Sequence, residues 1–125
     1  MKDNFKENLK PASNPTFELV AQKEKLRVLK AKVIEAMSGK GEFALDDTEQ
    51  ELLKMRFGLS PYEKKHTLEE IGNKLFAGIK NTLDKASMRR NRILTKLTKK
   101  LYNGTQTLRE NNLESILKYN ENRDI

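Results

Sequence analysis

The side chains best suited to chemistry in this chain are basic, and they are concentrated in one segment. Residues 80–100 hold eight Lys and Arg residues against a single acidic residue, Asp84, which gives a net charge of +7. Residues 1–79 have a net charge of +1 and residues 101–125 a net charge of −1, so this segment accounts for the formal charge of the whole protein. Because a solvated helix face usually mixes charge signs, the asymmetry predicts a polyanionic partner.

The composition offers little for catalysis or metal binding. There is no Cys and only one His, His66, which excludes thiolate ligands, a Cys nucleophile and His clusters. We recognise no nucleophile–base pair, phosphate-binding loop or paired acids, so we expect a protein that is not an enzyme and needs neither cofactor nor metal. No apolar run approaches the roughly 20 residues of a membrane span, and no signal peptide is recognisable. We therefore expect a cytoplasmic protein without membrane contact; a basic helix lying on anionic lipid is disfavoured because no Trp or Phe flanks the apolar side of residues 89–101.

The elements that must position the basic segment all carry helical patterns. A chain of 125 residues with 36% hydrophobic content indicates one small domain with a modest core. No useful β-alternation occurs, so we predict an all-α fold. Its expected parts are a flexible arm over residues 1–14, an N-terminal amphipathic helix within 15–41, a DNA-binding domain over 45–101, and a C-terminal helix and tail over 102–125, with the last helix at about 106–119.

The N-terminal helix begins near Pro15, which suits a first helical turn. Leu26, Leu29 and Val33 then recur at three- and four-residue steps, and residues 38–41 (Ser-Gly-Lys-Gly) end the pattern. The apolar seam must pack against the rest of the domain or against a second copy of the chain.

Two further helices carry explicit start and stop signals. Residues 46–51 (Asp-Asp-Thr-Glu-Gln-Glu) predict a capping box at a helix start, and a second box is expected from Thr67 to Glu70. Gly58 stands where a helix commonly turns left-handed, and Leu59 can fold back onto the last turn. Gly72 lies on the inward stripe of the helix after Thr67, where a close helix crossing would explain its tolerance.

These motifs resemble a known family. Residues 56–59 (Arg-Phe-Gly-Leu), a polar loop, residues 67–72 (Thr-Leu-Glu-Glu-Ile-Gly) and Lys96-Leu97 stand in the order found in region four of bacterial primary sigma factors. The resemblance covers residues 45–101, under half the chain. It implies a small helical domain with a sigma-like helix-turn-helix, flanked here by an extra N-terminal long helix and a short C-terminal helix. The implied partners are promoter double-stranded DNA and the RNA polymerase core, through the flap of its β subunit.

The alignment departs from the family in the recognition helix. By resemblance, Thr82, Asp84 and Lys85 match the family pattern, whereas Leu83, Ser87 and Met88 stand where the family carries Arg, Arg and Gln. Base reading is therefore not transferred to those three positions. Residues 76–79 (Phe-Ala-Gly-Ile) become an insertion in the turn.

The candidate DNA-binding residues combine this resemblance with the local charge. Asn81 and Lys85 are expected to reach base edges, and the arginines to contact phosphates. Thr67 can belong to a phosphate-binding helix start, although capping alone also explains it. Arg56 can contact backbone phosphate, as the resemblance suggests, or pair with a Glu. The full candidate set is Arg56, Thr67, Lys80, Asn81, Thr82, Asp84, Lys85, Ser87, Met88, Arg89, Arg90, Arg92 and Lys96.

Two alternatives remain at this point. Apolar residues at positions 68, 71, 75, 79, 83 and 86 also fit one unbroken helix, which would remove the helix-turn-helix. The chain could instead be a helical interaction or dimerisation module that regulates transcription without reading DNA. As a sigma-like protein it would be too short to melt a start site, so we expect it to need a separate factor, to serve as half of a split sigma, or to regulate rather than initiate. A homodimer and a second sigma-like subunit are both left open as partners.

Overall fold

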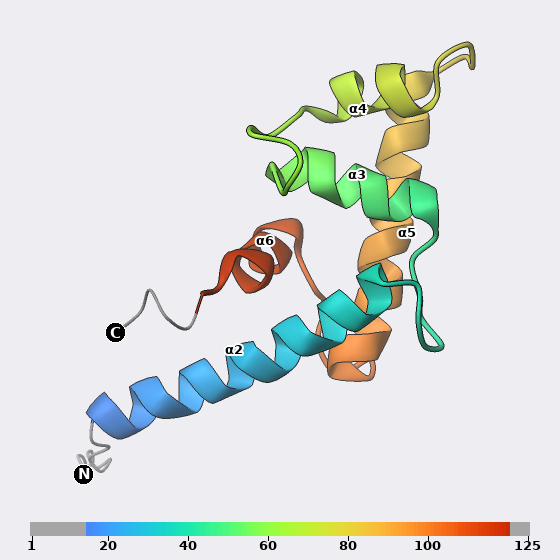
Figure 1. Ribbon diagram of the computed structural model, residues 1–125. Coiled ribbons are helices and arrows are strands. Elements are labelled where there is room, and N and C mark those ends of the chain that lie inside the picture. The colour runs from blue at the N-terminus through green and yellow to red at the C-terminus, as the bar shows by residue number, and fades with distance from the viewer. Residues whose placement is uncertain (1–14, 121–125) are drawn as a thin grey trace, which may run out of the picture.

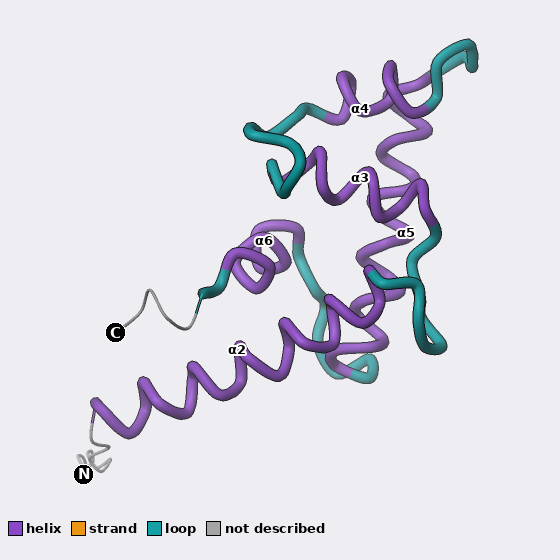
Figure 2. Tube along the Cα trace, viewed as in Figure 1, coloured by secondary structure: helices purple, strands orange, loops and turns teal. Residues whose placement is uncertain are grey.

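The computed structural model describes residues 15–120, with side chains described from Gln22 onward. Within this range the protein is all-helical, which confirms the predicted class (Figures 1 and 2). No strand occurs in the described range. The helices are α2 (Pro15–Met37), α3 (Asp47–Phe57), α4 (Leu68–Leu75), α5 (Thr82–Tyr102) and α6 (Glu110–Lys118). The predicted flexible arm, residues 1–14, lies outside the described residues.

Helix α5 is the element on which the others pack. It contacts α4, α3 and α2 along its length, and α2 also contacts α6 (Figure 1). The α2 seam of Leu29, Val33 and Ala36 is buried in the common core. This seam is therefore covered within one chain and needs no second copy to leave water.

The predicted signals of α3 are present as hydrogen bonds. Glu49 N–H donates to Asp46 Oδ1 at 2.8 Å, and Asp46 N–H donates to Glu49 Oε1 at 3.0 Å, which completes a capping box. Gly58 is left-handed at φ 67°, and Leu59 N–H donates to the Lys54 carbonyl at 2.8 Å. An ideal Cβ on Gly58 would lie 2.9 Å from the Lys64 carbonyl carbon, so this glycine also lets the 59–66 loop fold closely against the helix end.

The α4–α5 junction decides between the two interpretations of the basic segment. Helix α4 ends at Leu75 and α5 begins at Thr82, so the single unbroken helix is wrong. Its supposed inner stripe is exposed at Ile79 (50%) and Leu83 (48%). Gly78 and Asn81 take positive φ values of 85° and 59°, which reverse the chain between the two helices.

Gly72 makes the close crossing expected of it. An ideal Cβ at this position would stand 2.3 Å from the Thr82 carbonyl oxygen, so α4 and α5 meet backbone to backbone. The Thr82 hydroxyl also donates to Asn73 Oδ1 at 2.9 Å. Any side chain at position 72 would force the start of α5 away from α4.

The C-terminal helix begins later than predicted. It starts at Glu110 rather than near Gln106. Residues 103–109 turn instead, with Asn103 and Gly104 at positive φ, and Leu108 N–H donates to the Thr98 hydroxyl at 3.0 Å. Leu108 is therefore buried against α5 although it precedes α6. Its apolar side chain fitted the helical pattern only because it is also part of the core.

Candidate nucleic-acid interface

The outer face of α5 carries a row of exposed, unpaired cations. Lys85, Arg92 and Lys99 follow one another at seven-residue steps, which keeps them on one side of a helix. Lys80 precedes them in the turn. All four are exposed, and none has an ion pair or side-chain hydrogen bond with any other residue of the described range. The row is thus available to an external anion.

The other four cations of residues 80–100 are paired with acids from other elements. Arg89 Nη1 lies 3.2 Å from Asp46 Oδ2 at the start of α3. Lys100 Nζ lies 2.5 Å from Glu35 Oε1 of α2, and this contact lowers the pKa of the Glu35 carboxyl. Lys96 and Arg90 complete the set, and their pairs are described next. Half of the basic residues in the segment therefore have their charge balanced within the protein.

Lys96 reaches the one buried charged residue of the described core. Its Nζ lies 2.7 Å from Glu49 Oε1 and donates to the Ala44 carbonyl at 3.3 Å. Glu49 is fully buried, at 0% exposure. The same Glu49 oxygen accepts the capping bond of α3, so Lys96 connects the start of α3 to the middle of α5. Lys96, one of the candidate DNA-binding residues, is thus paired within the fold.

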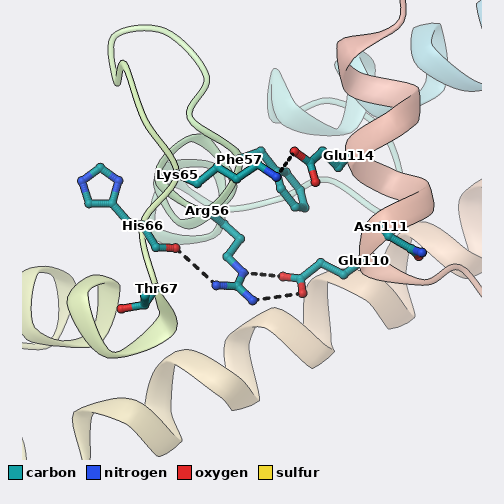
Figure 3. Close-up of a pocket in the computed structure, with 8 residues that line it drawn as sticks. All are labelled: Arg56, Phe57, Lys65, His66, Thr67, Glu110, Asn111 and Glu114. Carbon is teal, nitrogen blue, oxygen red and sulfur yellow. Dashed lines mark hydrogen bonds and ion pairs between the residues drawn. The ribbon is translucent and has the colours of Figure 1, made fainter.

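Glu110 holds two arginines from different helices. Its carboxylate accepts from Arg56 Nε at 2.7 Å and Nη2 at 3.2 Å (Figure 3). It also lies 3.5 Å from Arg90 Nη1. Arg56 Nη1 also donates to the His66 carbonyl at 3.3 Å. The start of α6 is thereby tied to α3, to the 59–66 loop and to α5. These Arg56 contacts correspond to the pairing alternative, with a Glu that lies 54 positions away in the chain.

A second acid of α6 is paired beside this cluster. Glu114 Oε2 lies 2.6 Å from Lys65 Nζ and 3.0 Å from Lys118 Nζ. The hydrogen bond from Lys65, followed by that from Lys118, lowers the pKa of the Glu114 carboxyl. Glu114 and Lys65, together with Arg56 and Glu110, line a hollow at the edge of Phe57 (Figure 3).

The remaining candidates lie around the start of α4 and α5. The Thr67 hydroxyl accepts from Glu70 N–H at 3.1 Å, and Thr67 N–H donates to Glu70 Oε1 at 2.8 Å, which lowers the pKa of Glu70. Asn81 and Asp84 are exposed, whereas Ser87 is half-buried. Asn81 precedes α5 without making a side-chain capping bond.

An apolar hollow adjoins the cation row and was not expected. It has a volume of about 470 Å³, and its surface is almost entirely apolar. Phe76 and Ile79 of the turn and Met88 of α5 line it, and Met88 is 64% exposed. Its remaining lining residues are Lys85, Arg89 and Arg92. Sequence reasoning treated residues 76–79 only as an insertion, because nothing local indicates that the turn folds beside α5.

No protein-family model, curated protein or solved structure matches this chain. Within the described residues, no group of acidic and His side chains is arranged to hold a metal ion. No helix of residues 15–120 has the length and apolar content needed to cross a bilayer.

The site therefore combines three surfaces on one helix. Lys80 in the turn and Lys85, Arg92 and Lys99 on the outer face have no partner within residues 15–120. The flank, formed by Arg89, Arg90, Lys96 and Lys100, is neutralised by acids of α2, α3 and α6, and the beginning of α5 borders an apolar hollow. Such a surface can attract a polyanion and present apolar atoms to it at the same time.

Proposed function

We propose that this protein is a sigma-like transcription regulator that binds double-stranded promoter DNA with the outer face of α5. The proposal rests on one observation above all: Lys80, Lys85, Arg92 and Lys99 are exposed and have no acidic partner in the described structure. A helix with such a row fits a DNA groove and neutralises phosphates on both sides of it.

The α4–α5 arrangement supports a groove-entering role. Residues 76–81 turn the chain, and Gly72 brings the two helices into close contact, so the first turns of α5 stand at an exposed corner of the molecule (Figure 1). Asn81 then lies where base edges could be read, and Lys85, a member of the cation row, contacts phosphate. The ordered motifs of residues 56–59 and 67–72 add the resemblance to sigma region four.

Contact with the RNA polymerase core, in the cytoplasm of a bacterium or of a phage-infected cell, belongs to the same proposal and rests on the resemblance alone. The resemblance implies that the flap binds in an apolar recess between α3 and α4, whereas the hollow at Phe57 is lined mostly by polar residues. Co-elution of the protein with core polymerase, measured without DNA, tests this part separately.

The alternative of a dimerisation or interaction module has less support. The α2 seam that a second copy would cover is already buried by other helices of the same chain from Leu29 to Ala36.

A salt-dependent titration with duplex DNA tests the proposal. The double variant Lys85→Ala/Arg92→Ala should lose at least about tenfold in affinity, because two charge-assisted phosphate contacts are removed. The slope of log affinity against log salt should become shallower by about two. Lys25→Ala/Lys32→Ala removes the same charge from exposed positions of α2 and should change the slope little. If the wild-type protein shows no affinity for duplex DNA at low salt, or if both double variants behave alike, the proposal is wrong.

A further inference from the structure

The apolar hollow beside α5 lies inside the basic surface rather than apart from it. Lys85 and Arg92, two members of the cation row, line it together with Met88, Phe76 and Ile79. Met88 is 64% exposed and Ile79 is 50% exposed. Single exposed apolar residues are ordinary on protein surfaces, but here they share one hollow and are surrounded by cations.

The spacing places Met88 between two cations on one helix face. It follows Lys85 by three residues and precedes Arg92 by four, so the three side chains lie along one side of α5. With a rise of about 1.5 Å per residue, Lys85 and Arg92 stand roughly 10 Å apart along the helix axis. Lys85 and Arg92 can then contact phosphates while Met88, which lies between them on the same side of α5, faces the base edges.

A partner for this surface must offer negative charge around an apolar group. Duplex DNA does so in its major groove, where phosphates border the groove and the 5-methyl group of thymine is the apolar feature of the base edges. The residues that could otherwise read hydrogen-bonding groups, Asn81 and Asp84, lie at the very start of α5.

On the basis of the proposed function, we propose that Met88 and Ile79 form a methyl-reading site, which makes the protein favour thymine over bases without a 5-methyl group. Met88 stands where the sigma family carries Gln, and the proposed site gives this difference a function. Phe76 and Ile79 then belong to the recognition surface rather than to a neutral insertion.

Two pairs of duplexes of equal length test the proposal. Alternating dA-dT is compared with alternating dA-dU, which lacks only the methyl groups, and alternating dG-dC is compared with its 5-methylcytosine form. Each methyl group buried on binding should strengthen affinity by about fourfold, the effect of one buried CH₂. Wild-type protein should therefore bind the methylated member of each pair more tightly, by a factor that salt changes little.

Variants of the protein show whether the hollow is responsible. Met88→Ala and Ile79→Ala should each reduce the preference for methylated duplexes, whereas Met88→Leu should keep most of it. Val28→Ala shortens a comparably exposed apolar side chain on α2 (45%) and should preserve it. Thermal unfolding of each variant identifies any loss that comes from misfolding.

The outcomes separate this inference from the proposed function. Salt-dependent binding without a methyl preference in the wild type overturns the methyl-reading site and leaves DNA binding in place. A preference that survives Met88→Ala and Ile79→Ala also overturns it, because the hollow would then serve another occupant, such as an acidic protein segment. Absence of any DNA binding overturns both proposals.

Discussion

Two faces of α5 carry similar numbers of cations but have different surroundings. On the outer face, Lys85, Arg92 and Lys99 have no acidic partner among the described residues. On the flank, Arg89, Arg90, Lys96 and Lys100 each meet a carboxylate from another element. The difference teaches that the charge of a segment is not the charge of its surface: half of the eight cations connect α5 to the fold, and only the other half are free to attract a partner.

The comparison also separates two kinds of mutational effect. Removing a flank cation leaves a carboxylate without its partner, and the free energy of unfolding falls most where that carboxylate is buried. Removing an outer cation leaves the fold intact and weakens only contacts with an external anion. Substitution of a flank cation should therefore change the free energy of unfolding, whereas substitution of a neighbouring outer cation should change DNA affinity.

The largest effect is expected at Lys96. The Lys96→Ala variant leaves Glu49 fully buried without its cation, and we expect the free energy of unfolding to fall by about 3 kcal/mol. Lys99→Ala, three residues away and exposed, should change it by less than about 0.5 kcal/mol. Urea denaturation followed by circular dichroism measures both. If the two variants have equal free energies of unfolding, the flank cations do not stabilise the fold more than the outer cations do.

Arg90 and Arg92 offer the closest matched pair. Arg90→Ala should lower the free energy of unfolding by about 1 kcal/mol through loss of its contact with Glu110, and should leave the salt slope of DNA binding unchanged. Arg92→Ala should have the reverse effect, with nearly unchanged stability and a salt slope shallower by about one. A shallower slope in Arg90→Ala would instead assign this arginine to phosphate contact.

Glu110→Gln tests whether a flank cation that loses its acidic partner becomes available to DNA phosphates. The substitution removes the negative charge shared by Arg56 and Arg90 but keeps a polar side chain of the same size. We expect a stability loss of about 1 kcal/mol and tighter DNA binding at low salt, with a steeper salt slope, because both arginines become available to phosphates. Lys65 and Lys118 remain paired with Glu114, so Glu114→Gln serves as the control for this acidic end of α6.

The smallest effect concerns the acid stability contributed by Glu35. The hydrogen bond and the charge of Lys100 hold the pKa of Glu35 below its usual value of 4.5. A carboxyl whose pKa is lowered by folding contributes stability above its unfolded pKa and loses it as the pH falls through the folded value. Glu35→Gln should therefore show a slightly weaker loss of stability below about pH 4.5 than the wild type. Glu69→Gln changes the charge equally at an exposed position of α4 and serves as the control. If the free energy of unfolding of both variants falls with pH in the same way, the prediction is wrong.

Local signals predicted much of the fold. The two capping boxes, the left-handed Gly58 and the close approach at Gly72 all follow from residue types a few positions apart, because caps and turns are made by neighbouring backbone groups. Glu49 was expected as a capping residue, but its complete burial was not, because burial depends on what packs over it.

The start of α6 and the turn before α5 show where local reasoning stops. Leu108 has helical spacing, but its N–H bonds the Thr98 hydroxyl of α5 and its side chain is buried in the core. The helix therefore begins only at Glu110. For residues 68–86, the same apolar stripe fitted one helix or two, and only the backbone reversal at Gly78 and Asn81 distinguishes them.

By itself, the sequence determined an all-helical chain, its capped helices and the concentration of positive charge in residues 80–100, because propensity, capping and composition act over a few residues. Only the tertiary structure decided which of those charges are free. Glu35, Glu49, Asp46 and Glu110 lie from 20 to 65 positions away from the cations they neutralise. No spacing rule connects such distant residues, since packing of α2 and α3 on α5, and of α6 on α2, is what brings their carboxylates within reach.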